Sequence, residues 1–145
     1  MKILVINGPN MNLLGKRERE LYGTKSLADL EDAIFEEAKN LGVNVEFFQT
    51  NYEGAIIEKI QQAEGVFDGI ILNPAGYTHT SVAIRDAISS ISVPVIEVHI
   101  TNIFSREDFR SRSITGGAAR GVITGLGIYG YILALNFLAK NYTID

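Results

Sequence analysis

The sequence predicts an α/β fold in which helices cover both faces of one parallel β-sheet. Short apolar runs alternate with longer segments of helical periodicity along the chain. Several of these runs are continuously hydrophobic, which is typical of parallel strands buried on both faces. The chain has 145 residues, of which 46% are hydrophobic and 21% charged. This size and composition suit a single compact domain over residues 1–145 and exclude a disordered chain.

Local signals mark where the elements begin and end. Asn7-Gly8-Pro9 ends the first apolar run, and Gly42 is a natural stop for the first long helix. Ser26 and Asp29 form a capping-box-like start for that helix, and Ser81 can cap a later one. The expected strands are 2–6, 43–50, 69–73, 93–99 and 121–124. The expected helices are 27–41, 56–63, 82–88 and 128–138, with a further short helix beginning at Ser105-Arg106-Glu107-Asp108 and a loop over 74–80.

Five strands that alternate with helices predict a doubly wound, flavodoxin-like parallel sheet of order 2-1-3-4-5. In this order the first and third strands are neighbours, and their connections leave on opposite faces of the sheet. A crevice then forms outside their carboxyl ends, where ligands usually bind. The loops after the first, third and fourth strands are therefore the candidate site.

Composition excludes several classes of chemistry. The chain has no cysteine, so disulfides, cysteine–zinc sites, iron–sulfur clusters and thiol nucleophiles are ruled out. The first apolar run is too short for a signal peptide or a membrane span, which predicts a cytoplasmic protein. Asn141-Tyr142-Thr143 fits a glycosylation pattern that carries little weight in that setting.

The net charge of −4 is unevenly distributed. Residues 1–25 and 105–120 are basic, whereas 26–104 carry three basic residues against twelve acids. An acidic body disfavours nucleic acid or an anionic membrane as a partner. The two basic segments indicate either a small anionic ligand or ordinary solvated surface charge, and the charge count alone does not separate them.

The loop after the first strand is unusually long. It covers 8–23, well beyond the usual length of such a connection, and carries Arg17 and Tyr22. A long loop bounded by glycines at a ligand-binding edge is typical of a lid. The alternative is a mobile surface loop.

Both histidines of the chain follow strands at the same predicted edge. Asn73 and His79 come from the end of the third strand and the loop after it. Glu97 and His99 are two residues apart on the fourth strand, so they share one face. A carboxylate beside an imidazole can fix its tautomer and raise its basicity. A lone histidine is more often a core residue, but this placement favours function.

Two other motifs are set aside. Gly125-Leu126-Gly127-Ile128-Tyr129-Gly130 matches GxGxxG, but too little chain follows it for the strand and acid of a dinucleotide site, so helix packing is the better interpretation. A metal site built from His79, His99 and carboxylates has no motif spacing to support it. The polar residues of the predicted crevice suit proton transfer on a small anion. Residue types alone do not identify that substrate.

At these loops the sequence closely resembles the type II 3-dehydroquinate dehydratases. The resemblance runs from Lys2 to about residue 139, with small departures at Met11, Arg19 and Thr101. The matching stretches are Asn7-Gly8-Pro9-Asn10 with Leu13-Leu14-Gly15, Arg17 with Tyr22-Gly23, Asn73-Pro74 with Tyr77-Thr78-His79-Thr80-Ser81, Arg85-Asp86, Glu97-Val98-His99-Ile100, Arg106-Glu107 with Phe109-Arg110, and Gly127 with Tyr129-Gly130-Tyr131.

The resemblance implies a hydro-lyase of the shikimate pathway. It would eliminate water in the anti sense from 3-dehydroquinate, through an enolate, to give 3-dehydroshikimate without metal, cofactor or Schiff base. By resemblance Tyr22 is the base that Arg17 activates, His99 is the acid toward the leaving hydroxyl, and Asn10 holds a water at the enolate oxygen.

The resemblance also implies how the substrate is held and how the chain assembles. Members of the family are typically dodecamers built from trimers. The implied binding residues are Asn73 and the backbone amides of Ile100 and Thr101 for the carboxylate, His79 and Arg110 for the ring hydroxyls, and Asp86 for a neighbouring subunit's site. The rival functions are a flavin or nucleotide binder and a non-catalytic oligomeric scaffold.

Overall fold

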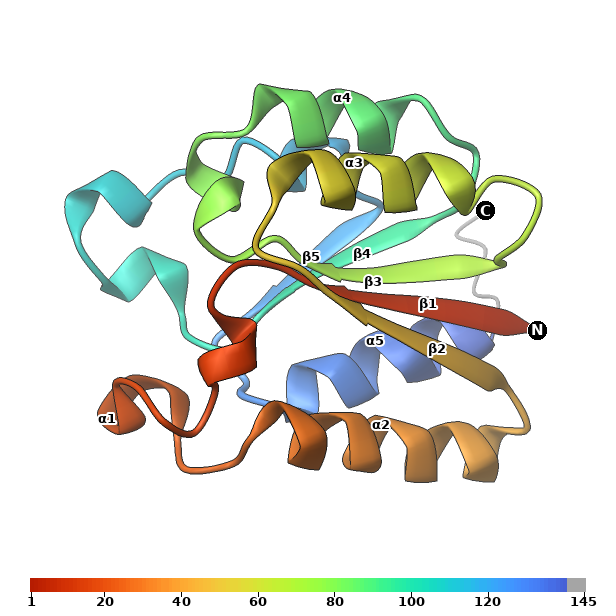
Figure 1. Cartoon of the computed structure of the whole chain (residues 1–145), viewed down its shortest axis with the longest axis horizontal. Helices are drawn as coiled ribbons and strands as arrows, with labels where there is room; N and C mark the ends of the chain where they lie inside the picture. Colours follow the sequence, from red (N-terminus) through yellow and green to blue (C-terminus); the bar gives the residue numbers. More distant parts are fainter. Residues whose placement is uncertain (141–145) are drawn as a thin grey trace.

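The fold is organised around five parallel strands, and the computed structural model describes residues 1–140 of the chain (Figure 1). The hydrogen-bonded order is β2-β1-β3-β4-β5, and every neighbouring pair is parallel. The predicted strand order is therefore confirmed. The glycosylation pattern that begins at Asn141 lies outside the described residues. The strands are β1 Lys2–Asn7, β2 Asn44–Gln49, β3 Gly69–Asn73, β4 Val95–His99 and β5 Gly121–Thr124.

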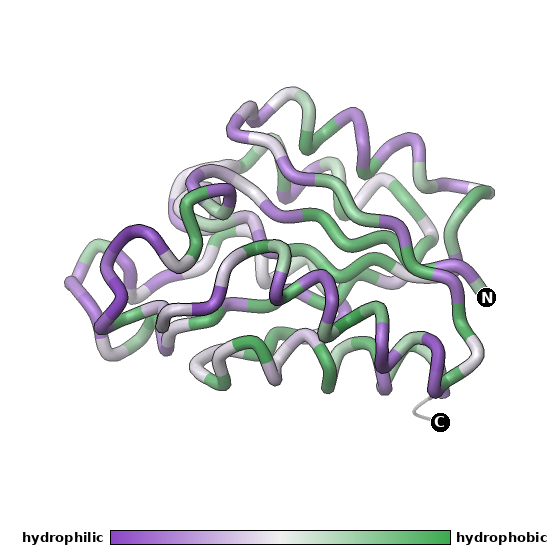
Figure 2. The backbone as a smooth tube through the Cα atoms, turned by 60° about the horizontal axis from the view of Figure 1, so that its bottom comes forward, coloured by the Kyte–Doolittle hydropathy of each residue, from purple (hydrophilic) through white to green (hydrophobic). Residues whose placement is uncertain are grey.

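Two helices cover each face of the sheet, as Figure 1 shows. α2 (Leu27–Leu41) and α5 (Tyr129–Ala139) lie on one face, and α3 (Glu53–Gln62) and α4 (Val82–Ser89) lie on the other. Because side chains alternate along a strand, β1 contributes to two separate cores. Ile3 and Val5 pack toward α2 and α5, while Leu4 and Ile6 pack toward α3 and α4. In Figure 2 the strands accordingly carry long hydrophobic stretches.

The predicted helix caps are present. Ser26 Oγ accepts a hydrogen bond from the Asp29 backbone, and the Asp29 carboxylate accepts one from the Ser26 backbone, which completes a capping box. Gly42 ends α2 at φ 69°, a left-handed conformation that glycine adopts without strain. Ser81 Oγ caps α4 by accepting from the Ile84 amide, so this hydroxyl serves the helix.

Some element boundaries differ from the prediction. β4 begins at Val95, because the preceding Pro94 has no amide hydrogen to add to the ladder. No helix starts at Ser105, since Asn102 begins an earlier turn by accepting from the Phe104 amide, and extended backbone at Arg106 separates two turns. Those turns are the 3-10 helices η3 (Ile103–Ser105) and η4 (Asp108–Arg110), and the predicted loop after β3 contains a third, η2 (Ala75–His79).

Short elements project beyond the carboxyl ends of the strands, at the left of Figure 1. They are η1 (Met11–Leu13) and α1 (Arg19–Tyr22) from the loop after β1, together with η3 and η4. In Figure 2 this end of the molecule is rich in hydrophilic residues. The sheet thus ends in a polar rim built from loops that are far apart in the sequence.

In the GxGxxG segment, residues 125–130, the last glycine lies where α5 packs against the sheet. A side chain at Gly130 would lie 3.2 Å from both Ile123 and Val98, so glycine lets α5 approach the sheet closely. Over residues 1–140, none of the helices combines the length and the apolar character needed to cross a bilayer.

Candidate active site

A cavity of about 110 Å³ lies at the carboxyl ends of β1, β3 and β4. It is the crevice expected from the strand order, since these strands end next to one another. The lining residues come from the loop after β1, from η2, from the end of β4 and from η3 and η4. Those named from the sequence are Asn10, Arg17, Tyr22, Asn73, His79, His99, Ile100, Thr101 and Arg110, and the others are Pro9, Met11, Ala75, Gly76, Ile103 and Arg106.

Tyr22 reaches the cavity from α1 and contacts two arginines. Arg106 Nη1 donates a hydrogen bond of 2.8 Å to the Tyr22 hydroxyl oxygen. Arg17 instead lies over the ring, with its guanidinium carbon 4.7 Å from the ring centroid. Arg106 Nε is buried and has no hydrogen-bond partner in the described structure. Arg106 also lies near the ring face, with its guanidinium carbon 5.5 Å from the centroid, so both arginines interact with the π system and Arg106 in addition bonds the hydroxyl oxygen.

The loop that carries Arg17 and Tyr22 is held by its own side chains. Arg19 Nε donates to the Gly15 carbonyl at 3.0 Å, and Arg17 pairs with Glu18 at 3.2 Å. Gly15 has φ 85°, and a side chain there would lie 2.8 Å from the Thr24 and Lys25 carbonyls. Arg19, one of the departures noted in the sequence, thus ties the start of α1 to the turn before it.

His99 and Glu97 form a buried pair at the end of β4. His99 Nε2 lies 2.7 Å from Glu97 Oε2, and the Glu97 side chain is 0% exposed. A hydrogen on Nε2 satisfies this contact, and Nδ1 is then the ring nitrogen left for the cavity that His99 lines. The pairing expected from their two-residue spacing is present.

Three hydroxyl groups complete the surroundings of the Glu97 carboxylate. Thr78 and Ser113 each donate to Oε2 at 3.0 Å, and Thr115 donates to Oε1. Burial alone raises the pKa of Glu97. The hydrogen bond and charge of His99, with the hydroxyls of Thr115 and Thr78, outweigh it and hold the pKa below its usual value. Glu97 is therefore a carboxylate at neutral pH.

His79 is oriented by a backbone carbonyl. Its Nδ1 lies 2.8 Å from the Arg112 carbonyl oxygen. Because a carbonyl only accepts, Nδ1 must carry the hydrogen, which leaves Nε2 for other contacts. This fixes the ring at the edge of the cavity that it lines.

Asn73 belongs to a buried polar chain below the cavity. Its Oδ1 accepts from the Ala75 amide at 3.0 Å, so its Nδ2 donates, at 2.8 Å, to the Tyr131 hydroxyl. Tyr131 in turn donates to Asn7 Oδ1 at 2.6 Å. Burial raises the pKa of Tyr131, against the hydrogen bond from Asn73, so this phenol stays neutral. This series of hydrogen bonds fixes the orientation of the Asn73 side-chain amide.

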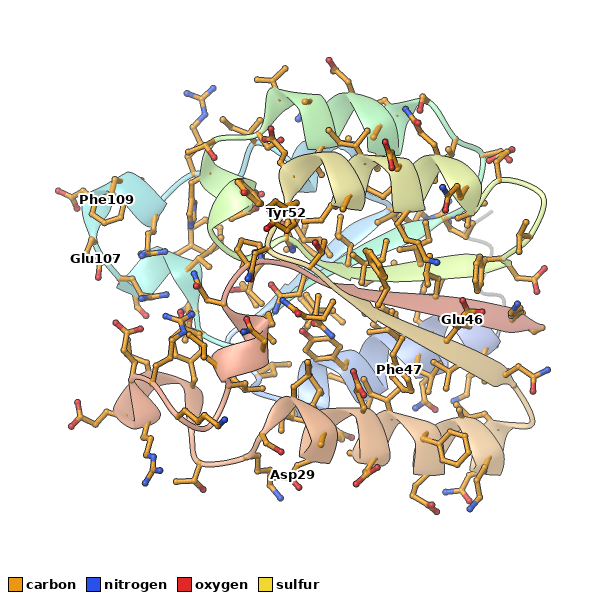
Figure 3. The ribbon with its side chains drawn as sticks, in the orientation of Figure 1. Asp29, Glu46, Phe47, Tyr52, Glu107 and Phe109 are labelled. Atoms are coloured by element: carbon orange, nitrogen blue, oxygen red, sulfur yellow. The ribbon has the colours of Figure 1, made fainter. Side chains whose placement is uncertain are left out.

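The remaining predicted residues lie on the loops that form the rim, directly after β4, or on α4. Asn10 has φ 69° and its amide donates to Asn51 Oδ1 at 3.0 Å. Arg110 Nε donates to Glu107 at 2.5 Å, and the labelled Glu107 lies on the projecting segment in Figure 3. Ile100 and Thr101 follow β4 and line the cavity. Asp86 is exposed on α4 and is not among the residues that line this cavity.

The sequence did not indicate the hydrogen-bond partner of Tyr22 or the hydroxyl groups around Glu97. Arg106 was noted only as part of a motif, although it lies in the basic segment 105–120 that the charge count singled out. Ser113 and Thr115 carried no signal, because their bonds to Glu97 join residues 16 and 18 positions apart. Across residues 1–140, no group of three or more His, Cys, Asp or Glu is placed to hold a metal ion.

Comparisons with known proteins identify the family. Residues 1–139 match the family model described as dehydroquinase class II. The 3-dehydroquinate dehydratase of Bacillus cereus (strain AH187) is 57% identical over 134 residues, which cover 92% of each chain.

Solved structures agree with this match. The type II dehydroquinase of Butyrivibrio crossotus superposes with a TM-score of 0.93 at 51% identity, covering 95% of this chain and 97% of that one. The type II dehydroquinase of Propionibacterium acnes gives a TM-score of 0.93 at 43% identity, covering 96% of each chain. The chain belongs to the class II dehydroquinase family.

Proposed function

We propose that this chain dehydrates 3-dehydroquinate to 3-dehydroshikimate, as a hydro-lyase of the shikimate pathway. Its family membership supports this activity. The observation that carries the chemistry is the cavity into which Tyr22, bonded to Arg106, and His99, bonded to Glu97, both face. A base and an acid from two different elements, α1 and β4, that line one small cavity suit an elimination that removes a proton and a hydroxyl group.

Tyr22 acts as the base. As a phenolate it removes the proton next to the ketone, and the electron pair moves onto the ketone oxygen to give the enolate. A free tyrosine is protonated at neutral pH, so the phenolate needs nearby positive charge. Arg106 on its oxygen and Arg17 over its ring supply that charge. Asn10 would hold a water at the enolate oxygen, as the resemblance implies.

His99 acts as the acid. The imidazolium form gives its Nδ1 proton to the hydroxyl group as the carbon–oxygen bond breaks and the enolate collapses, so that water leaves. Glu97 stabilises the imidazolium through Nε2. Because the proton taken by Tyr22 and the proton given by His99 balance, the overall reaction is loss of one water. Its anti sense is what the resemblance implies.

The substrate is an anion, and the lining suits one. Arg17, Arg106 and Arg110 line the cavity, together with both histidines. Asn73 and the backbone amides of Ile100 and Thr101 would hold the carboxylate, and His79 and Arg110 would hold the ring hydroxyls. Asn73 Nδ2 gives one hydrogen to Tyr131 and points the other at the Met11 sulfur, 3.5 Å away, a weak acceptor that a carboxylate would replace.

The oligomeric state, the cellular location and the lack of a cofactor are part of the same proposal. The whole chain, 1–145, would form one catalytic domain of a dodecamer built from trimers, working in the cytoplasm without metal or other cofactor and without nucleic acid or membrane as a partner. Asp86 would then reach the site of a neighbouring subunit. Its exposure on α4, outside its own chain's cavity, is compatible with that role.

A spectrophotometric assay tests the function. Purified protein is mixed with 3-dehydroquinate, and the ultraviolet absorbance of the conjugated enone is followed. A catalytic rise in that absorbance is expected, with a colourless protein. No rise, or a yellow protein with bound flavin, would favour the scaffold or the flavin binder instead.

A further inference from the structure

Four residues after η4 connect the surroundings of both histidines. We call Arg112–Thr115 the strap. The Arg112 carbonyl accepts from His79 Nδ1 at 2.8 Å, and the Ile114 amide donates to the Thr78 carbonyl at 2.6 Å. The hydroxyls of Ser113 and Thr115 both donate to Glu97, the partner of His99. One short irregular segment therefore bonds to η2, to His79 and to the carboxylate behind His99.

The strap supplies most of the hydroxyl groups around Glu97. A buried carboxylate is costly unless its oxygens are hydrogen-bonded. Two of the three hydroxyls that donate to Glu97 are on the strap, and the third, Thr78, also contacts Ser113 at 2.7 Å and Thr115 at 2.9 Å. Removing a strap hydroxyl would leave the carboxylate less firmly held against His99 Nε2, and a misplaced carboxylate stabilises the imidazolium less.

The strap has an anchor outside the cavity. Arg85 Nη1, from α4, donates to the Ile114 carbonyl at 2.7 Å. It fits against the bare backbone of Gly117, where a side chain carbon would lie 2.5 Å from the same nitrogen. Arg85 is not one of the residues that line the cavity. The Arg85 guanidinium therefore bonds the strap and does not touch a substrate in the cavity.

We propose that the strap is a positioning element that sets the hydrogen placement of both histidines, with Thr115 acting through Glu97 and Arg85 as the outside anchor. Its effect on turnover rests on the proposed function, but its effect on the rings does not. The Arg112 carbonyl holds the hydrogen of His79 on Nδ1. The Thr115 hydroxyl holds the Glu97 carboxylate aimed at His99 Nε2, so that the second proton of His99 faces the cavity from Nδ1.

Nuclear magnetic resonance of the imidazole nitrogens tests the proposal without substrate. The chain has two histidines, so the His79→Gln variant assigns both rings. In Thr115→Val, which keeps the side-chain shape, the His99 ring should lose its proton at a pH lower by about one unit, a tenfold change in the ratio of the two ring forms. The His79 signals should not move, and Thr115→Ser should restore the His99 titration.

The charges around His99 stay the same in these variants. Glu97 faces His99 directly, and Thr115→Val changes no charge. The titratable and charged groups that share the cavity are Tyr22, His79, Arg17, Arg106 and Arg110.

Thr50→Val is the matched control. Thr50 is a buried threonine at the end of β2, three strand positions from β4, whose hydroxyl accepts from the Tyr52 amide. It should leave the His99 titration unchanged. If Thr115→Val does not fold, Ser113→Ala is titrated instead, with a shift in the same direction expected. An unshifted His99 titration in the folded variant overturns the proposal.

Arg85→Gln tests the anchor. It should perturb the signals of both rings and lower kcat about 3- to 10-fold, with a smaller change in KM, as for a group that acts through others. Unchanged signals for both rings would show that Arg85 does not anchor the strap. If the unaltered protein does not turn over 3-dehydroquinate at all, the proposed function fails, while the titration of His99 still decides the role of the strap.

Discussion

Arg106 and Tyr22, which are 84 residues apart in the sequence, are joined by a 2.8 Å hydrogen bond from the guanidinium to the phenol oxygen. This contact links the projecting segment after β4 to the loop after β1, above the cavity. A second arginine, Arg17, covers the ring face of the same tyrosine. Arg106 lies over the same ring, 5.5 Å from its centroid, and in addition bonds the oxygen, so the removal of each arginine should have different consequences.

Arg106→Gln should lower kcat/KM by about 10- to 100-fold, because a charge-assisted hydrogen bond to the phenol oxygen is lost. The loss should fall mainly on kcat if the bond stabilises the phenolate. Steady-state kinetics with 3-dehydroquinate measures it. Arg120→Gln removes an exposed arginine at the start of β5, outside the cavity, and should keep normal activity. A normal kcat in Arg106→Gln would mean that this contact has no role in proton abstraction.

Arg17→Lys should cost about 5- to 30-fold in kcat/KM, although the charge is kept. Lysine lacks the planar group that stacks on the Tyr22 ring and is more strongly hydrated. The limb of the kcat/KM profile that reports the base should move to higher pH, because a poorly placed cation stabilises the phenolate less. An unshifted limb with only a raised KM would assign Arg17 to substrate binding alone. The double variant with Arg106→Gln should lose less than the product of the two effects.

Turnover should survive both EDTA and borohydride added with substrate. None of the residues that line the cavity is a lysine, so no amine is placed there to form a Schiff base with the ketone. Assay after each treatment, with mass spectrometry of the protein, measures the outcome. Inactivation by borohydride with added mass on a lysine would indicate covalent catalysis, and inactivation by EDTA that a divalent metal reverses would indicate a metal.

Glu97→Gln should destabilise the fold near neutral pH by about 1–3 kcal/mol, because the amide cannot accept from all the donors around it. It should also make stability less sensitive to acid. The folded protein holds the pKa of Glu97 below 4.5, so the unfolded chain binds more protons as the pH falls through that value. The stability that Glu97 contributes is therefore present above about pH 4.5 and lost below it.

Denaturant unfolding at a series of pH values measures this contribution. The unaltered protein should lose stability more steeply below pH 4.5 than the Glu97→Gln variant does. Parallel curves for the two proteins would contradict the role given to the buried carboxylate.

The fold was predictable because its signals are local. The apolar runs in β1 and β3, the capping box at Ser26 and the glycine stop at Gly42 each involve residues that are neighbours in the chain. Strand order then placed the candidate loops at one edge. The 3-10 turns around Arg106 were missed, since they depend on a side chain, Asn102, that competes for the backbone.

The partners within the site were not predictable in the same way. Glu97 and His99 could be paired because they are two residues apart on one strand. The bonds from Arg106 to Tyr22 and from Thr115 to Glu97 depend on how irregular segments fold back over the cavity. The hydrophobic periodicity of the sequence does not indicate where an irregular segment folds back against a distant strand.

The most direct test of the account is the kcat of Tyr22→Phe with 3-dehydroquinate. The variant removes the hydroxyl and keeps the ring over which Arg17 lies. We expect turnover to fall below a tenth of the normal kcat, with the fold intact by circular dichroism and substrate still protecting the protein against thermal unfolding. A folded Tyr22→Phe protein that keeps more than a tenth of the normal kcat would contradict the assignment of Tyr22 as the base.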